Sequence, residues 1–204
     1  MSARSKGGLG ACPQLSAALA VVALAGCTTS VGGISGPAPV APTSAGLPAR
    51  TKELSLRGVD PCKLLTAQQL DQLKENGTPR PVARDTQRDG PTCAFDVDAA
   101  PPTYTYYLET ITNADIDDWL TGSHRKPSMI TQPVEVPGFP ALINYPPVEG
   151  GVQDCETLVG VADGQTLRAQ MAPDDSSFSQ QQLCEKSTNF AELAVQTLSA
   201  AGGK

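Results

Sequence analysis

The chain has 204 residues, of which 40% are hydrophobic, and its formal net charge is −6. Its longest run of basic residues is Arg125-Lys126, so it lacks the basic stripe of a nucleic-acid-binding protein. The same charge balance disfavours direct docking on anionic lipid. We therefore expect no nucleic-acid partner and no electrostatic attachment to a membrane.

The first 26 residues have the pattern of an export signal. Arg4 and Lys6 are the only charged residues before Cys27, and the apolar run Leu15–Leu24 follows them. A basic start, a short apolar stretch and small residues at the end are typical of a secretory signal peptide. The run is too short for a transmembrane helix, which needs about 20 apolar residues. We therefore expect a signal peptide over residues 1–26.

The end of this signal resembles the bacterial lipobox. The segment Leu24–Cys27 (LAGC) matches the pattern Leu-Ala/Ser-Gly/Ala-Cys at every position. The resemblance implies that the Cys27 sulfur carries a diacylglycerol and that cleavage occurs before it. The alternative is a cysteine inside a signal that is cleaved elsewhere. Because two or more acyl chains anchor a protein stably, we expect a lipoprotein on the outer face of the cytoplasmic membrane.

A linker is expected between Cys27 and the folded part of the chain. Residues 28–57 are rich in Thr, Ser, Gly, Pro and Ala. Such a segment cannot bury enough apolar surface to offset its chain entropy, and as a flexible coil it spans roughly 30 Å. We predict a disordered linker over 27–57 and one globular domain over 58–204, a length typical of a single domain.

Four cysteines lie in the expected domain: Cys62, Cys93, Cys155 and Cys184. An even number of cysteines in an exported chain predicts two disulfides. Of the three pairings we favour the two that are local in sequence, Cys62–Cys93 and Cys155–Cys184, each closing a loop of about 30 residues. A metal site would need C-x-x-C or Cys/His spacing, which these cysteines lack. We therefore expect no metal and no cofactor.

The first elements of the domain are predicted to be helical. Asp60 and Pro61 suit the N-cap and the first position of a helix. Thr66 and Gln69 form a capping box at the start of a second helical stretch, which ends before residue 76. Residues 76–92 are polar and contain Pro and Gly, so we predict a loop there.

Strand-forming segments follow this loop. Two strands are expected over 93–98 and 103–112, and a short helix with acidic residues in its first turn over 113–120. Two further strands are expected at 129–136 and 141–145, where prolines restrict them to edges or short lengths.

The clearest β-hairpin is expected over 155–171, with Asp163-Gly164 as its turn. A two-residue turn would pair Leu158 with Ala169 on one face and place Arg168 on the other. A helix over 177–200 then closes the chain.

The apolar residues of that last helix lie near one face: Leu183, Phe190, Leu193, Ala194 and Leu198. The order of elements predicts an α+β fold. We expect a single domain with a mainly antiparallel sheet, helices packed on one face and two disulfides.

Several of these residues together resemble a family of actinobacterial lipoproteins, the domain-of-unknown-function family DUF3558. The resemblance rests on Asp60–Thr66 (DPCKLLT), on Cys93 with the aromatic Phe95 after it, and on two later cysteines. It covers 58–204 with the lipobox and linker, although the family often has Trp where this chain has Phe95. More distantly, the arrangement is similar to the two-disulfide extracellular sensor domain of a mycobacterial serine/threonine kinase. This implies a related fold and ligand sensing, and transfers no catalytic residue.

The sequence shows no recognisable catalytic set. The only histidine, His124, lies beside Arg125-Lys126 and is interpreted as a solvated loop residue, and a G-x-S-x-G elbow is missing. The acids Asp115, Asp117 and Asp118 lack the Gly and Glu of a calcium loop and fit a helix N-terminus. A carboxylate pair for glycoside hydrolysis stays open, because its members come from distant parts of a sequence.

Aromatic residues are the one positive indication of a site: Tyr104, Tyr106, Tyr107, Trp119 and Tyr145. Exposed aromatics beside acidic loops would form a patch for a ligand or partner. The alternative is that the tyrosines simply pack in the sheet.

Three functions are compatible with the sequence. The leading hypothesis is a non-catalytic binding or sensor module, held at the membrane by its lipid, with an envelope protein or a small molecule as ligand. The alternatives are a hydrolase of envelope polymers and a structural or chaperone-like accessory lipoprotein of a membrane complex.

Overall fold

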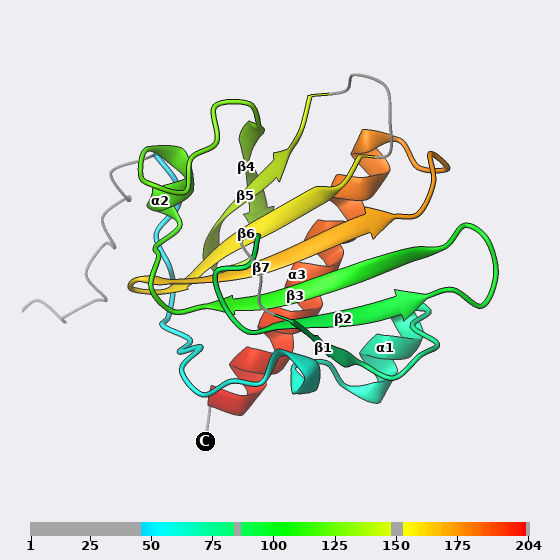
Figure 1. Ribbon diagram of the computed structural model, residues 1–204. Coiled ribbons are helices and arrows are strands. Elements are labelled where there is room, and N and C mark those ends of the chain that lie inside the picture. The colour runs from blue at the N-terminus through cyan, green and yellow to red at the C-terminus, as the bar shows by residue number, and fades with distance from the viewer. Residues whose placement is uncertain (1–45, 84–86, 148–152, 203–204) are drawn as a thin grey trace, which may run out of the picture. The chain divides into compact units, whose positions relative to one another are not determined.

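Seven antiparallel strands form one sheet in the computed structural model, which describes residues 46–83, 87–147 and 153–202 (Figure 1). Their spatial order is β1-β2-β3-β7-β6-β5-β4. Their bounds are Arg80–Val82 (β1), Thr92–Val97 (β2), Tyr104–Ile111 (β3), Ile130–Val136 (β4), Phe139–Tyr145 (β5), Cys155–Ala162 (β6) and Gln165–Pro173 (β7). The expected export signal and Cys27 lie outside the described residues.

In the described residues, three helices and one 3₁₀ turn accompany the sheet: η1 (Pro61–Lys63), α1 (Ala67–Leu73), α2 (Asp117–Leu120) and α3 (Gln180–Gly202). The long helix α3 packs along one face of the sheet, as Figure 1 shows. The predicted α+β fold with an antiparallel sheet is therefore confirmed. Among the described helices, none is both long and apolar enough to cross a membrane.

Both predicted disulfides are present. Cys62 in η1 is bonded to Cys93 in β2, and Cys155 at the start of β6 is bonded to Cys184 in α3. Each bond ties a helical element to a strand on the α3 face. The preference for pairing cysteines that are local in sequence is confirmed.

The predicted helix starts are formed by the expected side chains. The Asp60 carboxylate accepts a hydrogen bond from the Cys62 N–H at 3.0 Å, although the turn that follows is a short 3₁₀ helix. The Thr66 hydroxyl accepts from the Gln69 N–H, and the Gln69 side chain accepts from the Thr66 N–H, which completes the capping box. These are contacts between neighbours in sequence, so the sequence is enough to predict them.

The prediction that 76–92 is entirely loop is wrong, because β1 lies within it. β1 pairs with β2 at the edge of the sheet, where Pro81 is tolerated because it need not donate to a further strand. The Arg80 guanidinium fixes this edge by bonding the Asp96 carboxylate of β2, Nε to Oδ2 at 2.9 Å. Three residues with a central proline give no alternating pattern, so this strand depends on a partner that is distant in sequence.

The predicted hairpin register is wrong by one residue. Ala162 pairs with Gln165 as a two-residue turn requires, but the register shifts between Gly160 and Ala162. This β-bulge places Leu158 opposite Arg168 instead of Ala169. The carbonyl of Val161, within the bulge, accepts a hydrogen bond from the Leu54 N–H at 2.8 Å.

The disordered linker expected over 27–57 is contradicted for its last twelve residues. Leu47, Leu54 and Leu56 are 1%, 5% and 1% exposed, and Leu56 N–H donates to the Gln165 side chain at 2.7 Å. This segment therefore belongs to the folded domain, which begins earlier than residue 58. Its three leucines bury enough apolar surface to hold it on the sheet.

The two faces of the sheet have separate cores. The core on the α3 face includes Phe95, Tyr106 and Phe190, whose rings are in contact. A smaller core on the other face gathers residues from the N-terminal segment, α2 and the strands: Leu47, Ile111, Ala114, Ile116, Trp119, Leu142 and Leu158.

Candidate functional site

The predicted aromatic patch does not form, because its members lie in different places. Tyr104 and Tyr106 are 5% and 2% exposed in the α3-face core, and Trp119 is 4% exposed in the smaller core. Tyr107 is only half-buried, and the Arg88 guanidinium lies over its ring at 4.5 Å. Tyr145 lines a groove beside α3, and Tyr104 lines a different hollow on the same face of the sheet. The interpretation that tyrosines pack in the sheet therefore holds for Tyr104 and Tyr106.

The interpretation of His124 as a solvated loop residue is wrong. Its ring stacks on Trp119 with centroids 4.5 Å apart, and its Nε2 lies 3.5 Å from the Asp89 carboxylate. The side chain is 23% exposed. His124 therefore fastens the loop after α2 to the loop before β2.

The acidic residues around α2 bond backbone groups. The Asp118 carboxylate accepts from the Asp115 N–H, and the Asp115 carboxylate accepts from the Gly164 N–H at the turn of the β6–β7 hairpin. In the part of the chain that the structure describes, no group of three or more Cys, His, Asp or Glu side chains is placed to hold a metal.

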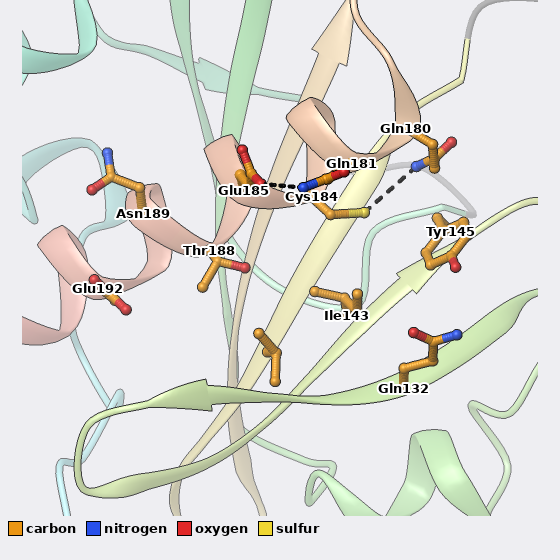
Figure 2. Close-up of a pocket in the computed structure, with 11 residues that line it drawn as sticks. Gln132, Ile143, Tyr145, Gln180, Gln181, Cys184, Glu185, Thr188, Asn189 and Glu192 are labelled. Carbon is orange, nitrogen blue, oxygen red and sulfur yellow. Dashed lines mark hydrogen bonds between the residues drawn. The ribbon is translucent and has the colours of Figure 1, made fainter.

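An open groove of about 580 Å³ lies between α3 and the β4–β5 edge of the sheet (Figure 2). Strands β4 and β5 supply Gln132, Val134, Ile143 and Tyr145, and α3 supplies Gln180, Gln181, Cys184, Glu185, Thr188, Asn189 and Glu192. Ligand cavities in proteins are typically about 300–1,000 Å³. The groove is therefore large enough for a small molecule.

The periodicities of strand and helix explain why these residues meet. On a strand, residues two apart share a face, so Ile143 and Tyr145 both point toward α3. On α3, residues spaced by three or four positions share a face, as Gln181, Glu185 and Thr188 do. This polar stripe beside the apolar stripe of α3 is visible in the sequence. It identifies a site only once the edge strands are known to lie across from it.

The floor of the groove is apolar and its helix wall is polar and acidic. Val134, Ile143 and the Cys155–Cys184 disulfide form the apolar part. Two amides of the wall have their donors bound within the protein: Gln180 Nε2 donates to the Asp154 carbonyl at 3.0 Å, and Gln181 Nε2 donates to Glu185 at 2.8 Å. Glu185 and Glu192 add two carboxylates, and the described lining contains no Lys, Arg or His.

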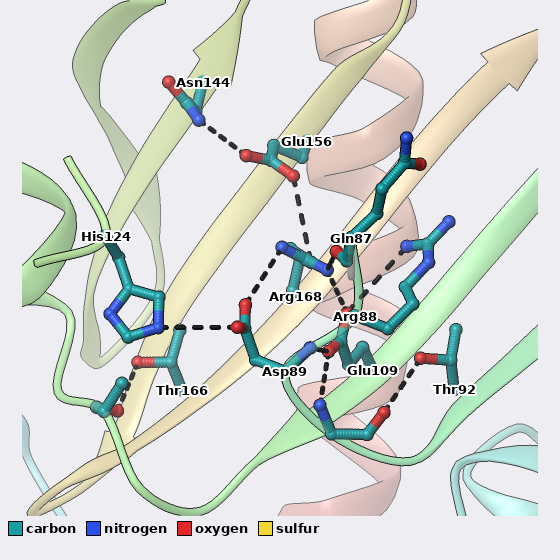
Figure 3. Close-up of polar contacts among 12 residues, drawn as sticks. Gln87, Arg88, Asp89, Thr92, Glu109, His124, Asn144, Glu156, Thr166 and Arg168 are labelled. Atoms are coloured by element: carbon teal, nitrogen blue, oxygen red, sulfur yellow. Dashed lines mark hydrogen bonds and ion pairs between the residues drawn. The ribbon is translucent and has the colours of Figure 1, made fainter. Parts of the chain in front are cut away.

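The opposite face of the sheet carries a second polar feature, which we call the ionic row (Figure 3). It crosses the strands through these side chains: Thr131 on β4, Asn144 on β5, Glu156 on β6, Arg168 on β7 and Glu109 on β3. Asn144 donates to Glu156 at 2.5 Å, and the Arg168 guanidinium donates to Glu109. The row is thus a continuous chain of polar contacts across five strands.

Arg168 is the centre of the row and is almost fully buried, with 5% of its side chain exposed. Its Nη2 donates to Glu109 and to the Gln87 carbonyl, and its Nη1 lies 3.5 Å from the Asp89 carboxylate. Its Nε is 3.8 Å from Glu156 and has no hydrogen-bond partner among the described residues. One cation is therefore shared among three carboxylates.

Glu109 holds the loop before β2 on the sheet. It is fully buried, and its Oε1 accepts hydrogen bonds from the N–H groups of Asp89 and Gly90 at 2.5 and 2.6 Å. Gly90 lies so close to β3 that a Cβ would be 2.1 Å from the Thr110 carbonyl oxygen. Burial raises the pKa of the Glu109 carboxyl, although Arg168 and the two N–H groups favour its charged form.

The groove is the candidate functional site, and the ionic row is a structural feature. The polar atoms of the row mostly bond one another and the loop that covers them, whereas the groove is open and lined by an apolar floor. A concave, mainly apolar cavity with a few polar groups is the usual form of a ligand site.

Comparison with known proteins assigns the chain to a family. The family described as "Protein of unknown function (DUF3558)" matches residues 22–197. The chain belongs to the DUF3558 family. No curated protein matches it.

Among solved structures, the lipid transfer and protein localization domain of human StarD13 (DLC2) is similar. The match has a TM-score of 0.28 and 9% sequence identity, and it covers 64% of this chain and 92% of that chain. A similarity at this level carries no argument about fold or ligand.

Proposed function

We propose that this DUF3558 protein is a non-catalytic binding module whose ligand occupies the groove between α3 and the β4–β5 edge. The observation that carries the proposal is the open cavity of about 580 Å³ with an apolar floor. Burial of apolar ligand surface on Val134, Ile143 and the disulfide supplies binding free energy at roughly 25 cal/mol per Å² before the costs of association.

The polar side chains in the wall of the groove restrict which head group a ligand can have. Gln180 and Gln181 each donate an amide N–H within the protein, to Asp154 and to Glu185, while the amides of Gln132 and Asn189 also line the groove. Glu185 and Glu192 repel an anion. The ligand that fits is an amphiphile with an apolar body and an uncharged or cationic head.

Binding in the groove is tested with N-phenyl-1-naphthylamine, a neutral dye that fluoresces in apolar sites. The variant Val134→Trp fills the floor from the edge strand and should weaken dye binding at least tenfold. Glu135→Trp is the matched control, since this neighbouring residue of β4 is exposed and does not line the groove. Equal dye binding by both variants and the unmodified protein would refute the proposal.

We propose further that the module is a lipoprotein of the cell envelope, held at the outer face of the cytoplasmic membrane. The lipobox Leu24–Cys27 and the apolar run before it support this proposal. The variant Cys27→Ser should appear in the medium or stay unprocessed in cell fractionation. Normal processing with retention in the membrane would show that Cys27 is not the anchor.

A further inference from the structure

A second cleft lies on the other side of α3 from the groove. It has a volume of about 350 Å³ and is formed where the end of α1, the β2–β3 turn and the start of α3 come together. Its walls include the apolar side chains of Val97, Pro101 and Phe178, the ring of Tyr104, and two lysines, Lys74 and Lys186. None of the described residues that line it is acidic.

The two lysines face the cleft without carboxylate partners. No ion pair joins either ammonium group to a carboxylate of the described residues. Lys186 is half-buried, and burial first and the charge of Lys74 second lower the pKa of its ammonium group. A half-buried cation next to a second cation lacks the counter-charge that usually stabilises it.

Two aromatic rings hold Lys186 in place. Its Nζ lies 5.0 Å from the centroid of Tyr104 and 5.3 Å from that of Phe178, and the rings meet edge to face at 5.4 Å. In cation–π contacts of this kind the ammonium group is attracted to the face of the ring. They position the ammonium group beside a flat apolar wall and leave hydrogen-bond donors free for a ligand.

Asp98 and Glu185, two acidic residues of neighbouring segments, have hydrogen-bond partners other than the two lysines. Asp98 is bonded to Asn76, through both its carboxylate and its backbone N–H. Glu185 lines the neighbouring hollow that shares Lys74 and Lys186, and its carboxylate accepts from Gln181 on the groove side of the helix. Within the cleft itself the charge is positive.

We propose that this cleft is a second ligand site, for a small anion joined to an apolar group, such as an aromatic carboxylate, phosphate or sulfonate. The lysines would bind the anionic head, and the wall of Tyr104, Phe178 and Val97 would bind the apolar part. The cleft lies near the lower end of the usual size of ligand cavities, so its ligand is smaller than that of the groove. The site does not depend on the proposed function of the groove.

The test compares two dyes that share an aromatic body. The sulfonate dye 8-anilinonaphthalene-1-sulfonate carries the anion, and neutral N-phenyl-1-naphthylamine lacks it. Both are titrated into the protein and into Val134→Trp, in which the groove is filled. We expect Lys186→Gln and Lys74→Gln each to weaken binding of the sulfonate about tenfold, since a charged hydrogen bond is worth about 1.5–3 kcal/mol.

Lys63→Gln is the control, because its side chain is 83% exposed and pairs with Asp60 outside the cleft. It should leave the affinity for the sulfonate unchanged, and all three lysine variants should keep their affinity for the neutral dye. Unchanged sulfonate binding in Lys186→Gln and Lys74→Gln would overturn the proposal. An equal loss for both dyes would also overturn it, because it would show that the anion is not recognised.

Discussion

The two faces of the sheet hold other segments in place by different chemistry. On the α3 face, an apolar core and two disulfides tie η1 and α3 to the strands. On the opposite face, a buried ionic row centred on Arg168 and Glu109 holds the loop before β2. One face is secured by covalent bonds and a large apolar core, and the other by a smaller apolar core together with buried ion pairs.

The difference between the two faces explains on which of them an open groove can form. Apolar packing tolerates a groove at its edge, because the missing contacts there cost only part of the buried area. A buried ion pair is more sensitive to a lost contact, since each charge that loses its partner carries a large desolvation penalty. The groove lies on the α3 face, and smaller hollows of about 270 and 260 Å³ reach the ionic row beside its loop.

The largest expected effect is that of Arg168→Leu. It removes the guanidinium that is hydrogen-bonded to the fully buried Glu109 and leaves only Arg88, whose Nη1 lies 3.8 Å from that carboxylate. We expect a loss of about 3–5 kcal/mol in the free energy of unfolding. Arg80→Leu breaks an ion pair whose arginine side chain is 54% exposed and should cost about 0–1 kcal/mol. Urea denaturation measures both. Equal losses would contradict the special role of the ionic row.

The double variant Arg168→Leu/Glu109→Leu separates a lost attraction from an orphaned charge. If the cost of the single variant comes from the uncompensated carboxylate, removing that carboxylate as well should recover part of the stability. A double variant that is less stable by the sum of both single losses would show that the two side chains are not coupled, and would contradict this account.

Removal of the Cys155–Cys184 bond should have the next largest effect. The bond joins two cysteines that are 29 positions apart in sequence. In the chain-entropy model, a disulfide that closes a loop of that length stabilises the fold by about 3–4 kcal/mol. We expect Cys155→Ala/Cys184→Ala to lower the free energy of unfolding by this amount while the loop bound to Glu109 keeps its protection from hydrogen exchange. If that loop also lost its protection from hydrogen exchange in the folded state, the two faces of the sheet would not be independent.

A matched experiment tests the other disulfide, Cys62–Cys93. Cys62→Ser should free the thiol of Cys93 alone, as measured by alkylation and peptide mapping. A free thiol at Cys155 or Cys184 would contradict the observed pairing.

The smallest expected effects concern pH. The carboxylates of Asp96 and Glu109 should contribute to the stability of the fold with opposite dependence on pH. Hydrogen bonding to Arg80 lowers the pKa of Asp96, so its contribution to stability is present above the ordinary pKa of 3.8 and is lost as the pH falls through the lower folded value. Burial raises the pKa of Glu109, so its folded form holds a proton more tightly than the unfolded chain. Stability from this group is present below 4.5 and is lost as the pH rises through the folded value.

Thermal unfolding between pH 3 and 7 measures this difference. Asp96→Asn should flatten the acid side of the stability profile, and Glu109→Gln should remove a decline toward neutral pH. If both substitutions change the profile in the same direction, the assignment of one of the two carboxylates is wrong.

The sequence determined the features that depend on neighbours along the chain. The capping box of Thr66 and Gln69, the turn at Asp163-Gly164 and the apolar stripe of α3 each arise from contacts within a few residues. The disulfide pairing followed from the same locality, because each pair closes a loop of about 30 residues. These local rules were enough for the α+β fold.

Only the tertiary structure decided the features that depend on partners far apart in sequence. Leu54 meets the bulge at Val161, Arg168 meets Glu109, and Ile143 faces Thr188 across the groove. None of these pairs produces a periodic pattern, since each is selected by burial in the folded chain. Most of the aromatic residues that were predicted to mark a site lie in the core for the same reason: burial is a property of the assembled sheet and not of the residue type.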